Sequence, residues 1–189
     1  MITTSYCRKE GIPTNYLSRL VREGVIKRVE RGVYLAGEGS WDEYYFFQHR
    51  YTKAIFSYET ALHLLGVIDK IPQVMDVTVH RSYKFNEEMD GVLVHYVEKR
   101  IHELGVVEAP TMFGNNVRIY SYERTLCDFI AHQEEMDREI FVKIVRSYEH
   151  YAGKDIHALY EIALAMGIVK EVRAIMEVVC LPVGCFDPR

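Results

Sequence analysis

The first 24 residues place apolar and polar side chains at helical spacing, with one turn between two short runs. Thr3 or Thr4 can cap a helix that continues to about Glu10, because a hydroxyl there accepts a hydrogen bond from an unpaired first-turn amide. The stretch Gly11–Ile12–Pro13 predicts a turn, and Pro13 suits the first turn of the next helix, where its missing N–H costs nothing. We therefore expect two short helices joined by a tight turn.

The second of these helices has one apolar and one polar face. Leu17, Leu20 and Val21 follow the i, i+3, i+4 rule and are expected to point inward. The side chains expected to face outward are Asn15, Ser18, Arg19 and Arg22. Gly24 is placed to end the helix.

A hairpin pattern follows directly. Val25–Val29 and Gly32–Leu35 alternate around the turn Glu30–Arg31–Gly32, which predicts two antiparallel strands. A helix, a turn, a second helix and a basic hairpin in this order are typical of a winged helix-turn-helix. Such a module lays its second helix in the DNA major groove and its hairpin along the backbone.

A helix-turn-helix is normally braced by a preceding helix, and the given chain starts at the first helix of the turn motif. We expect that the leading helix is missing and that Met1 is an internal methionine of a longer reading frame. The alternative is that a later segment supplies the brace.

The rest of the chain predicts strands first and helices after them. Gly37–Ser40 is expected to be a linker, and Asp42 begins an aromatic-rich helix that includes Tyr44 and Phe47. Strands are expected at 54–57, 74–79, 92–97, 106–113 and 117–121, with a helix at 59–66. From Ser121 onward the apolar stripes are helical.

The predicted fold class is therefore α+β, a small winged helix-turn-helix followed by a mixed strand-then-helix body. The predicted domains are a DNA-binding domain at 1–38, an α+β domain at 42–180 and an irregular tail at 181–189.

Charge is distributed unevenly between these parts. The formal net charge is −4, yet residues 1–36 contain seven Lys and Arg against three Glu, and residues 37–189 contain 16 bases against 24 acids. A basic module on an acidic body points to contact with nucleic acid through the module.

The candidate DNA contacts follow from the outward face and the hairpin. Arg19 is the best candidate for a guanine contact and Asn15 for an adenine contact. The candidates for phosphate contacts near the wing are Lys27, Arg28 and Arg31. Arg8 and Lys9 are candidates for contacts with the flanking DNA backbone. Thr14, Tyr16, Ser18 and Arg22 complete the predicted surface. The alternative is a solvated helix followed by a charged hairpin without a partner.

Other chemistry leaves weaker signals. The eight histidines are scattered without an HExxH or His-x-His pattern, and the four cysteines form no CxxC pair, so we expect no metal and no cofactor. Runs of acids such as 134–139 are read as solvated turns and helix starts.

Most of the 14 tyrosines are expected in the core, with an interface role as the alternative. We find no signal peptide and no membrane-spanning run.

Three stretches together resemble a known family. They are Asn15–Gly24 with Arg28–Tyr34, then Ala54–Leu62, then Phe113–Asp128 with its Ser-x-Glu-Arg-Thr-Leu-Cys-Asp segment. These residues resemble AbiEi-type antitoxins of bacterial abortive-infection (phage-defence) toxin–antitoxin operons. Compared with that pattern, the given chain is expected to lack the leading helix.

The resemblance implies a two-part cytoplasmic protein that is not an enzyme. Its N-terminal module would bind inverted repeats in promoter DNA and repress its own operon. Its larger domain would neutralise a cognate nucleotidyltransferase-like toxin encoded in the same operon.

Two alternatives remain open from the residues. One is a one-component regulator that senses a small ligand, which needs a closed apolar pocket with a few convergent polar groups. The other is a nuclease or other enzyme built on the α+β body, which needs clustered carboxylates and a metal.

Overall fold

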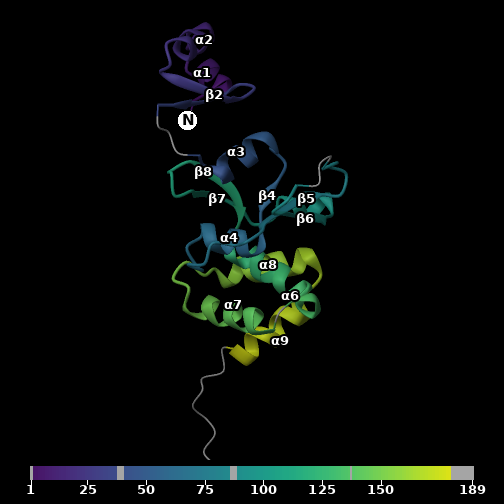
Figure 1. Ribbon diagram of the computed structural model, residues 1–189. Helices are drawn as coiled ribbons and strands as arrows, with labels where there is room; N and C mark the ends of the chain where they lie inside the picture. The colour runs from purple at the N-terminus through teal and green to yellow at the C-terminus, as the bar shows by residue number, and fades with distance from the viewer. Residues whose placement is uncertain (1, 38–40, 86–88, 137, 180–189) are drawn as a thin grey trace, which may run out of the picture. The chain divides into compact units, whose positions relative to one another are not determined.

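The computed structural model describes residues 2–37, 41–85, 89–136 and 138–179 (Figure 1). These divide into two compact units, Met1–Glu43 and Tyr44–Arg189, and each is treated by itself. Both units combine helices and strands, which confirms the predicted α+β class. The expected tail at 181–189, and residues 38–40 of the expected linker, lie outside the described residues.

The small unit is a winged helix-turn-helix in its element order and sheet pairing. Its elements are β1 (Ile2–Thr3), α1 (Thr4–Lys9), α2 (Asn15–Arg22), β2 (Ile26–Glu30) and β3 (Val33–Ala36). Among these residues the strands form one antiparallel sheet in the order β1-β3-β2. Its core contains the buried Cys7, Leu17, Ile26 and Tyr34, with Ile2 and Leu20 packed against them.

The expected cap at Thr3 and the glycine after α2 are confirmed, but Pro13 lies before the N-cap Thr14 and not in the first turn of α2, and one expected core residue is wrong. The Thr3 hydroxyl accepts a hydrogen bond from the Tyr6 amide at 3.0 Å, and Gly24 adopts a left-handed φ of 73° after α2. Val21, predicted to point inward, is 36% exposed. The small core covers only a narrow strip of α2, which Leu17 and Leu20 already fill.

The tip of the hairpin is attached to the start of α1. The Thr4 amide donates to the Gly32 carbonyl at 2.9 Å, and Thr3 pairs with Val33 across β1 and β3. Gly32 has a φ of +83°, and a Cβ there would lie 2.7 Å from the Thr4 hydroxyl oxygen. A glycine is therefore required where the turn meets the helix.

The larger unit is built on a mixed sheet with helices on both faces. Its described strands are β4 (Ile55–Phe56), β5 (Met75–His80), β6 (Val92–Val97), β7 (Val106–Pro110) and β8 (Asn116–Tyr120). They lie in the order β6-β5-β4-β8-β7, in which β4 pairs antiparallel with β5 and parallel with β8. Four of the five expected strands begin and end within one residue of their predicted positions; the strand expected at 106–113 ends at Pro110, and Thr111–Gly114 form the turn.

Helix α3 (Glu43–Arg50) lies on one face of this sheet, and α4 (Tyr58–Leu64) and the C-terminal helices lie on the other (Figure 1). Phe47 and Tyr51 join a core with Phe56, Val77 and Ile119 on the α3 side. A second core is formed with α6 (Tyr122–Ala131), α7 (Arg138–His150), α8 (Ile156–Met166) and α9 (Val169–Val179). Two short helical turns, α5 (Lys99–His102) and η1 (Gln133–Glu135), connect these elements.

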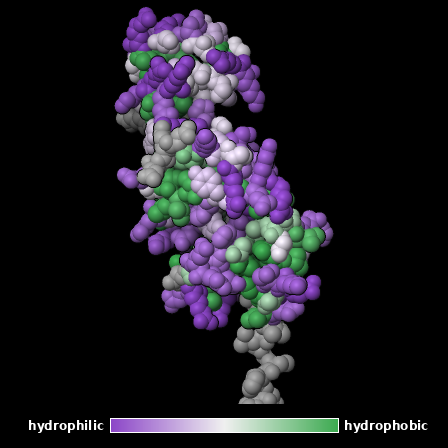
Figure 2. All heavy atoms as spheres, turned by 90° about the vertical axis from the view of Figure 1, so that its right-hand side faces the viewer, coloured by the Kyte–Doolittle hydropathy of each residue, from purple (hydrophilic) through white to green (hydrophobic). Residues whose placement is uncertain are grey.

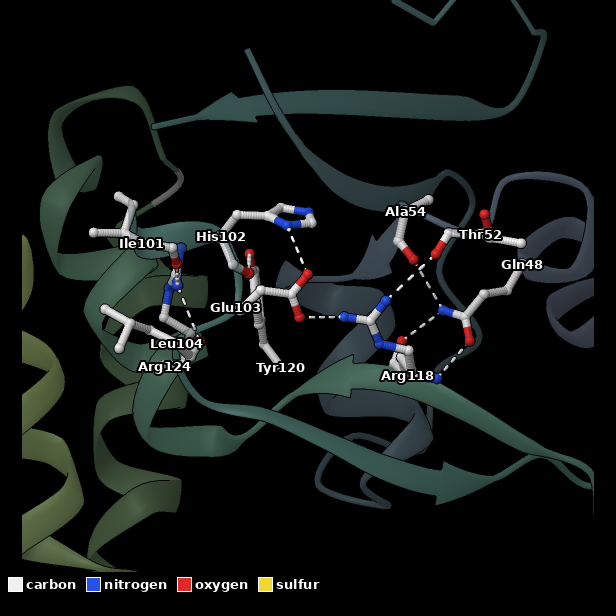
Figure 3. A network of polar contacts seen from close by, with 10 residues as sticks. All are labelled: Gln48, Thr52, Ala54, Ile101, His102, Glu103, Leu104, Arg118, Tyr120 and Arg124. Carbon is white, nitrogen blue, oxygen red and sulfur yellow. Dashed lines mark hydrogen bonds and ion pairs between the residues drawn. The ribbon is translucent and has the colours of Figure 1, made fainter. Parts of the chain in front are cut away.

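Polar side chains connect α3 to the sheet (Figure 3). The Gln48 amide group donates to the carbonyls of Ala54 and Arg118 at 3.0 and 2.8 Å, and its oxygen accepts from the Arg118 amide at 2.6 Å. The Arg118 guanidinium in turn donates to Glu103 at 2.5 Å and to the Thr52 carbonyl at 3.3 Å. These contacts hold the helix against β8 in a single register.

A buried arginine connects the helices to the sheet. Arg124 of α6 is fully buried, and its Nε donates to both carboxylate oxygens of Asp128 at 3.1 Å. Its Nη1 donates to the carbonyls of Ile101 and Leu104, and its guanidinium carbon lies 4.1 Å from the centre of the Tyr120 ring (Figure 3). One side chain therefore contacts α6, the α5 segment and β8.

The rest of the segment Ser121–Asp128 is also structural. The Ser121 hydroxyl caps α6 by accepting from the Arg124 amide at 3.3 Å. The Glu123 carboxylate accepts from the Tyr148 hydroxyl at 3.2 Å and from the Asp155 amide at 3.0 Å. Burial raises the pKa of the Cys127 thiol to about 12, so this thiol is not a nucleophile near neutral pH.

Replacing Gly105 by alanine should strongly destabilise the larger unit. Gly105 has a φ of +67°, and a Cβ there would lie 2.6 Å from the Cβ of the buried Arg124. We expect a loss of about 3–5 kcal/mol, because the left-handed backbone cost and a steric clash add. Gly114→Ala is the matched control, since Gly114 has a φ of +78° but open space around it, and should lose about 1–2 kcal/mol. Equal losses in urea unfolding would contradict the clash.

Removing the Arg124 cation should make stability depend on pH with a definite sign. Burial raises the pKa of Asp128, and the neighbouring Arg124 opposes that rise. In Arg124→Met the pKa should rise further, so the folded state disfavours the carboxylate and stability falls as pH increases above about 4. We expect a loss of about 3–5 kcal/mol near pH 7.5, smaller at pH 5.

Urea unfolding followed by circular dichroism at both pH values measures this effect. The double variant Arg124→Met/Asp128→Leu should recover most of the loss, because it leaves no unpaired charge. An Arg124→Met profile parallel to that of the wild type would refute the assignment.

Candidate nucleic-acid interface

The outward face of α2 is polar and open in the small unit. Asn15, Ser18, Arg19 and Arg22 lie at i, i+3, i+4 and i+7, so they share one face of the helix, and all are exposed. The small unit, at the top of Figure 2, is mostly hydrophilic in that view. A polar face that contributes nothing to the core is available to a ligand.

Arg19 already has two neighbours on this face. Its Nε lies 3.3 Å from a Glu23 carboxylate oxygen, and its guanidinium carbon lies 5.4 Å from the centre of the Tyr16 ring. Both partners are exposed, and an exposed i, i+4 pair of this kind contributes only about 0.3–0.5 kcal/mol. The guanidinium is therefore held along the helix surface by contacts that a base or a phosphate can replace.

Thr14 precedes α2 without using its side chain as a cap. It adopts helical dihedral angles as the N-cap residue, and no capping hydrogen bond is made to its hydroxyl. The helix is positioned from its buried side by Leu17. This leaves the exposed hydroxyl of Thr14 beside Asn15 at the start of the candidate surface.

The basic residues of the hairpin do not share one face. Successive side chains on a strand point to opposite faces, so Arg28 shares the core side with Ile26, while Lys27 points away from it. The register agrees, since Arg28 lies opposite the buried Tyr34. The Arg28 Nε donates to the Glu30 carbonyl at 3.2 Å across an irregularity in the pairing.

The remaining cations lie at the ends of local elements. Arg8 and Lys9 form the last turn of α1, and Arg31 lies in the hairpin turn. All eleven predicted DNA-contact residues are exposed, on α1, on or just before α2, and on the hairpin. Contact of these residues with DNA stays a prediction.

The comparisons with known proteins concern this unit. Residues 1–37 match the model of a family described as "Transcriptional regulator, AbiEi antitoxin". No curated protein matches the chain. The matched range coincides with the described winged helix-turn-helix, and the resembling stretches beyond residue 37 lie outside it.

The larger unit brings together a polar cluster that the sequence pattern does not reveal. Tyr58, Asp76, His95 and His132 are separated by 18 residues or more along the chain, yet His95 contacts Tyr58 and Asp76, and Tyr58 contacts His132. The scattered positions carry no periodic signal. The pairing of β5 with β6 places Asp76 and His95 in proximity.

No group of three or more His, Cys, Asp or Glu among the described residues is arranged to hold a metal ion. No helix in the described ranges combines the length and the apolar character needed to cross a membrane.

Proposed function

We propose that this protein is an antitoxin of a bacterial abortive-infection system that also represses its own operon by binding promoter DNA. One observation carries the DNA-binding half: an exposed polar face at i, i+3, i+4 and i+7 on α2, beside a basic hairpin, in the region that matches the regulator family. The proposal makes the protein a cytoplasmic regulator with no catalytic role.

Helix α2 would enter the major groove with its outward face against the base edges. Arg19 would exchange Glu23 for a guanine and Asn15 would pair with an adenine, since these side chains match the acceptors and donors of those bases. Arg28, Arg31, Arg8 and Lys9 would neutralise phosphates without reading sequence.

The larger unit would supply the antitoxin half. Its net acidic charge makes it an unsuitable general DNA binder, so a separate role for it is consistent with the charge separation. The proposed partner is a nucleotidyltransferase-like toxin encoded in the same operon. This half rests on the family resemblance.

Arg19→Ala and Arg28→Ala should weaken DNA binding in different ways. We expect Arg19→Ala to cost about 1–3 kcal/mol and to relax preference at one base position of the operator. Arg28→Ala should weaken binding to all sequences and reduce the slope of log K against log salt by about one. Fluorescence anisotropy with promoter and scrambled duplexes at several salt concentrations measures both.

Lys27→Ala is the comparison within the hairpin, because Lys27 is also a predicted phosphate contact but points to the opposite face of the strand. It should change the salt slope less than Arg28→Ala does. The DNA-binding half is refuted if the wild type shows no salt-dependent binding to its own promoter.

Co-expression with the neighbouring toxin gene should separate the two activities. The full chain carrying Arg19→Ala and Arg28→Ala should lose promoter repression and still rescue growth. A chain that ends after Glu43 should keep promoter binding, which shows that it is folded, and fail to rescue. Rescue by the short chain, or loss of rescue in the double variant, would contradict the assignment of neutralisation to the larger unit.

A further inference from the structure

The larger unit contains a cavity of about 480 Å³ among α4, β5, β6 and the end of α6. This volume is within the range of about 300–1,000 Å³ that small-molecule sites occupy. Tyr58, Asp76 and His95 line the inner part, and the exposed His132 and Glu135 line the outer part. None of these groups has a role in the proposed DNA contact.

His95 is oriented by a carboxylate. Its Nε2 lies 2.8 Å from Asp76 Oδ1, and because a carboxylate only accepts, Nε2 carries the proton in the neutral ring. The lone pair is then on Nδ1, for which no hydrogen-bond partner is found among the described residues. The cavity therefore presents an oriented acceptor that a bound donor can use.

The residue beside His95 has an unusual backbone. Tyr58 has a φ of +47°, and among the described residues no other non-glycine has a positive φ. The conformation is maintained by the Ser57 amide, which donates to the Asp76 carbonyl at 3.0 Å, and by the Tyr58 ring, whose centre is 4.1 Å from that of His95. The Tyr58 hydroxyl lies 3.2 Å from His132 Nδ1. Strained residues held in this way cluster at ligand sites.

The charges around the cavity favour one kind of ligand. Among the described residues that line it, the carboxylates of Glu59, Asp76 and Glu135 outnumber the one lysine, Lys70, so an anion would be repelled. Val74 and Leu93, both substantially exposed, add apolar wall. We infer that this cavity binds a small organic cation, whose amine or amidine group donates to His95 Nδ1 and to the carboxylates while its apolar body lies against Val74 and Leu93.

Benzamidine is a suitable probe, with neutral benzamide and anionic benzoate as matched compounds of the same shape. Each is titrated into the ¹⁵N-labelled full chain and followed by amide chemical shifts. Benzamidine should shift the amides of Tyr58, Asp76 and His95 saturably, with a Kd on the order of 1 mM or tighter. Benzamide should bind at least tenfold more weakly, and benzoate should not saturate.

Two variants locate the site. Glu59→Gln and His95→Phe should each weaken benzamidine binding at least fivefold, whereas Glu161→Gln and His157→Phe, at exposed positions on α8, should leave it unchanged. The amide spectrum reports whether each variant is folded, and if His95→Phe unfolds, the conservative Glu59→Gln decides.

Absence of saturable benzamidine shifts at the cavity overturns the inference. So does equal binding of benzoate, or unchanged affinity in Glu59→Gln. The titration contains no DNA and no toxin, so its failure would leave the proposed function untouched.

Discussion

The architecture of the larger unit depends on one buried guanidinium. Arg124 is removed from water, and such a charge is tolerated only where carboxylate and carbonyl acceptors surround it. The acceptors are Asp128 on the same helix and the carbonyls of Ile101 and Leu104 before β7, with the Tyr120 ring against the guanidinium. Because these partners come from separate elements, α6 has one position relative to the sheet. A Cβ at Gly105 would clash with the Arg124 side chain, so the buried position of Arg124 requires a glycine at residue 105.

Much of the architecture can be predicted from local patterns, because the spacing of apolar residues within each short element indicates which of its faces is buried. The two N-terminal helices, the hairpin around Arg31 and the change to helix after Ser121 follow from spacing and turn chemistry, and the structure has them at those positions. Val21 is exposed although its spacing predicts an inward position. Periodicity indicates which way a side chain points, but not how wide the core is. Because side chains alternate along a strand, Lys27 and Arg28 lie on opposite faces of the hairpin, which a count of basic residues does not show.

The candidate sites differ in how far the sequence can predict them. The surface of α2 is contiguous along the chain, so its composition is visible in any reading of residues 14–22. The Tyr58, Asp76, His95 and His132 cluster is produced by strand pairing and by the meeting of α4 with the end of α6. No spacing rule connects these positions, because tertiary contacts alone bring them together. The Ser121–Asp128 segment carries part of the family resemblance, and its side chains serve packing, capping and ion pairing.

The bond between the Thr4 amide and Gly32 has a consequence for recognition. It joins the hairpin tip to the start of α1, so the tip moves away from that helix only if this bond breaks. If α2 and the hairpin contact DNA as proposed, this bond limits how far the spacing between their side chains can change. Less conformational freedom would then be lost on binding, and an operator whose groove width does not fit that spacing would bind more weakly.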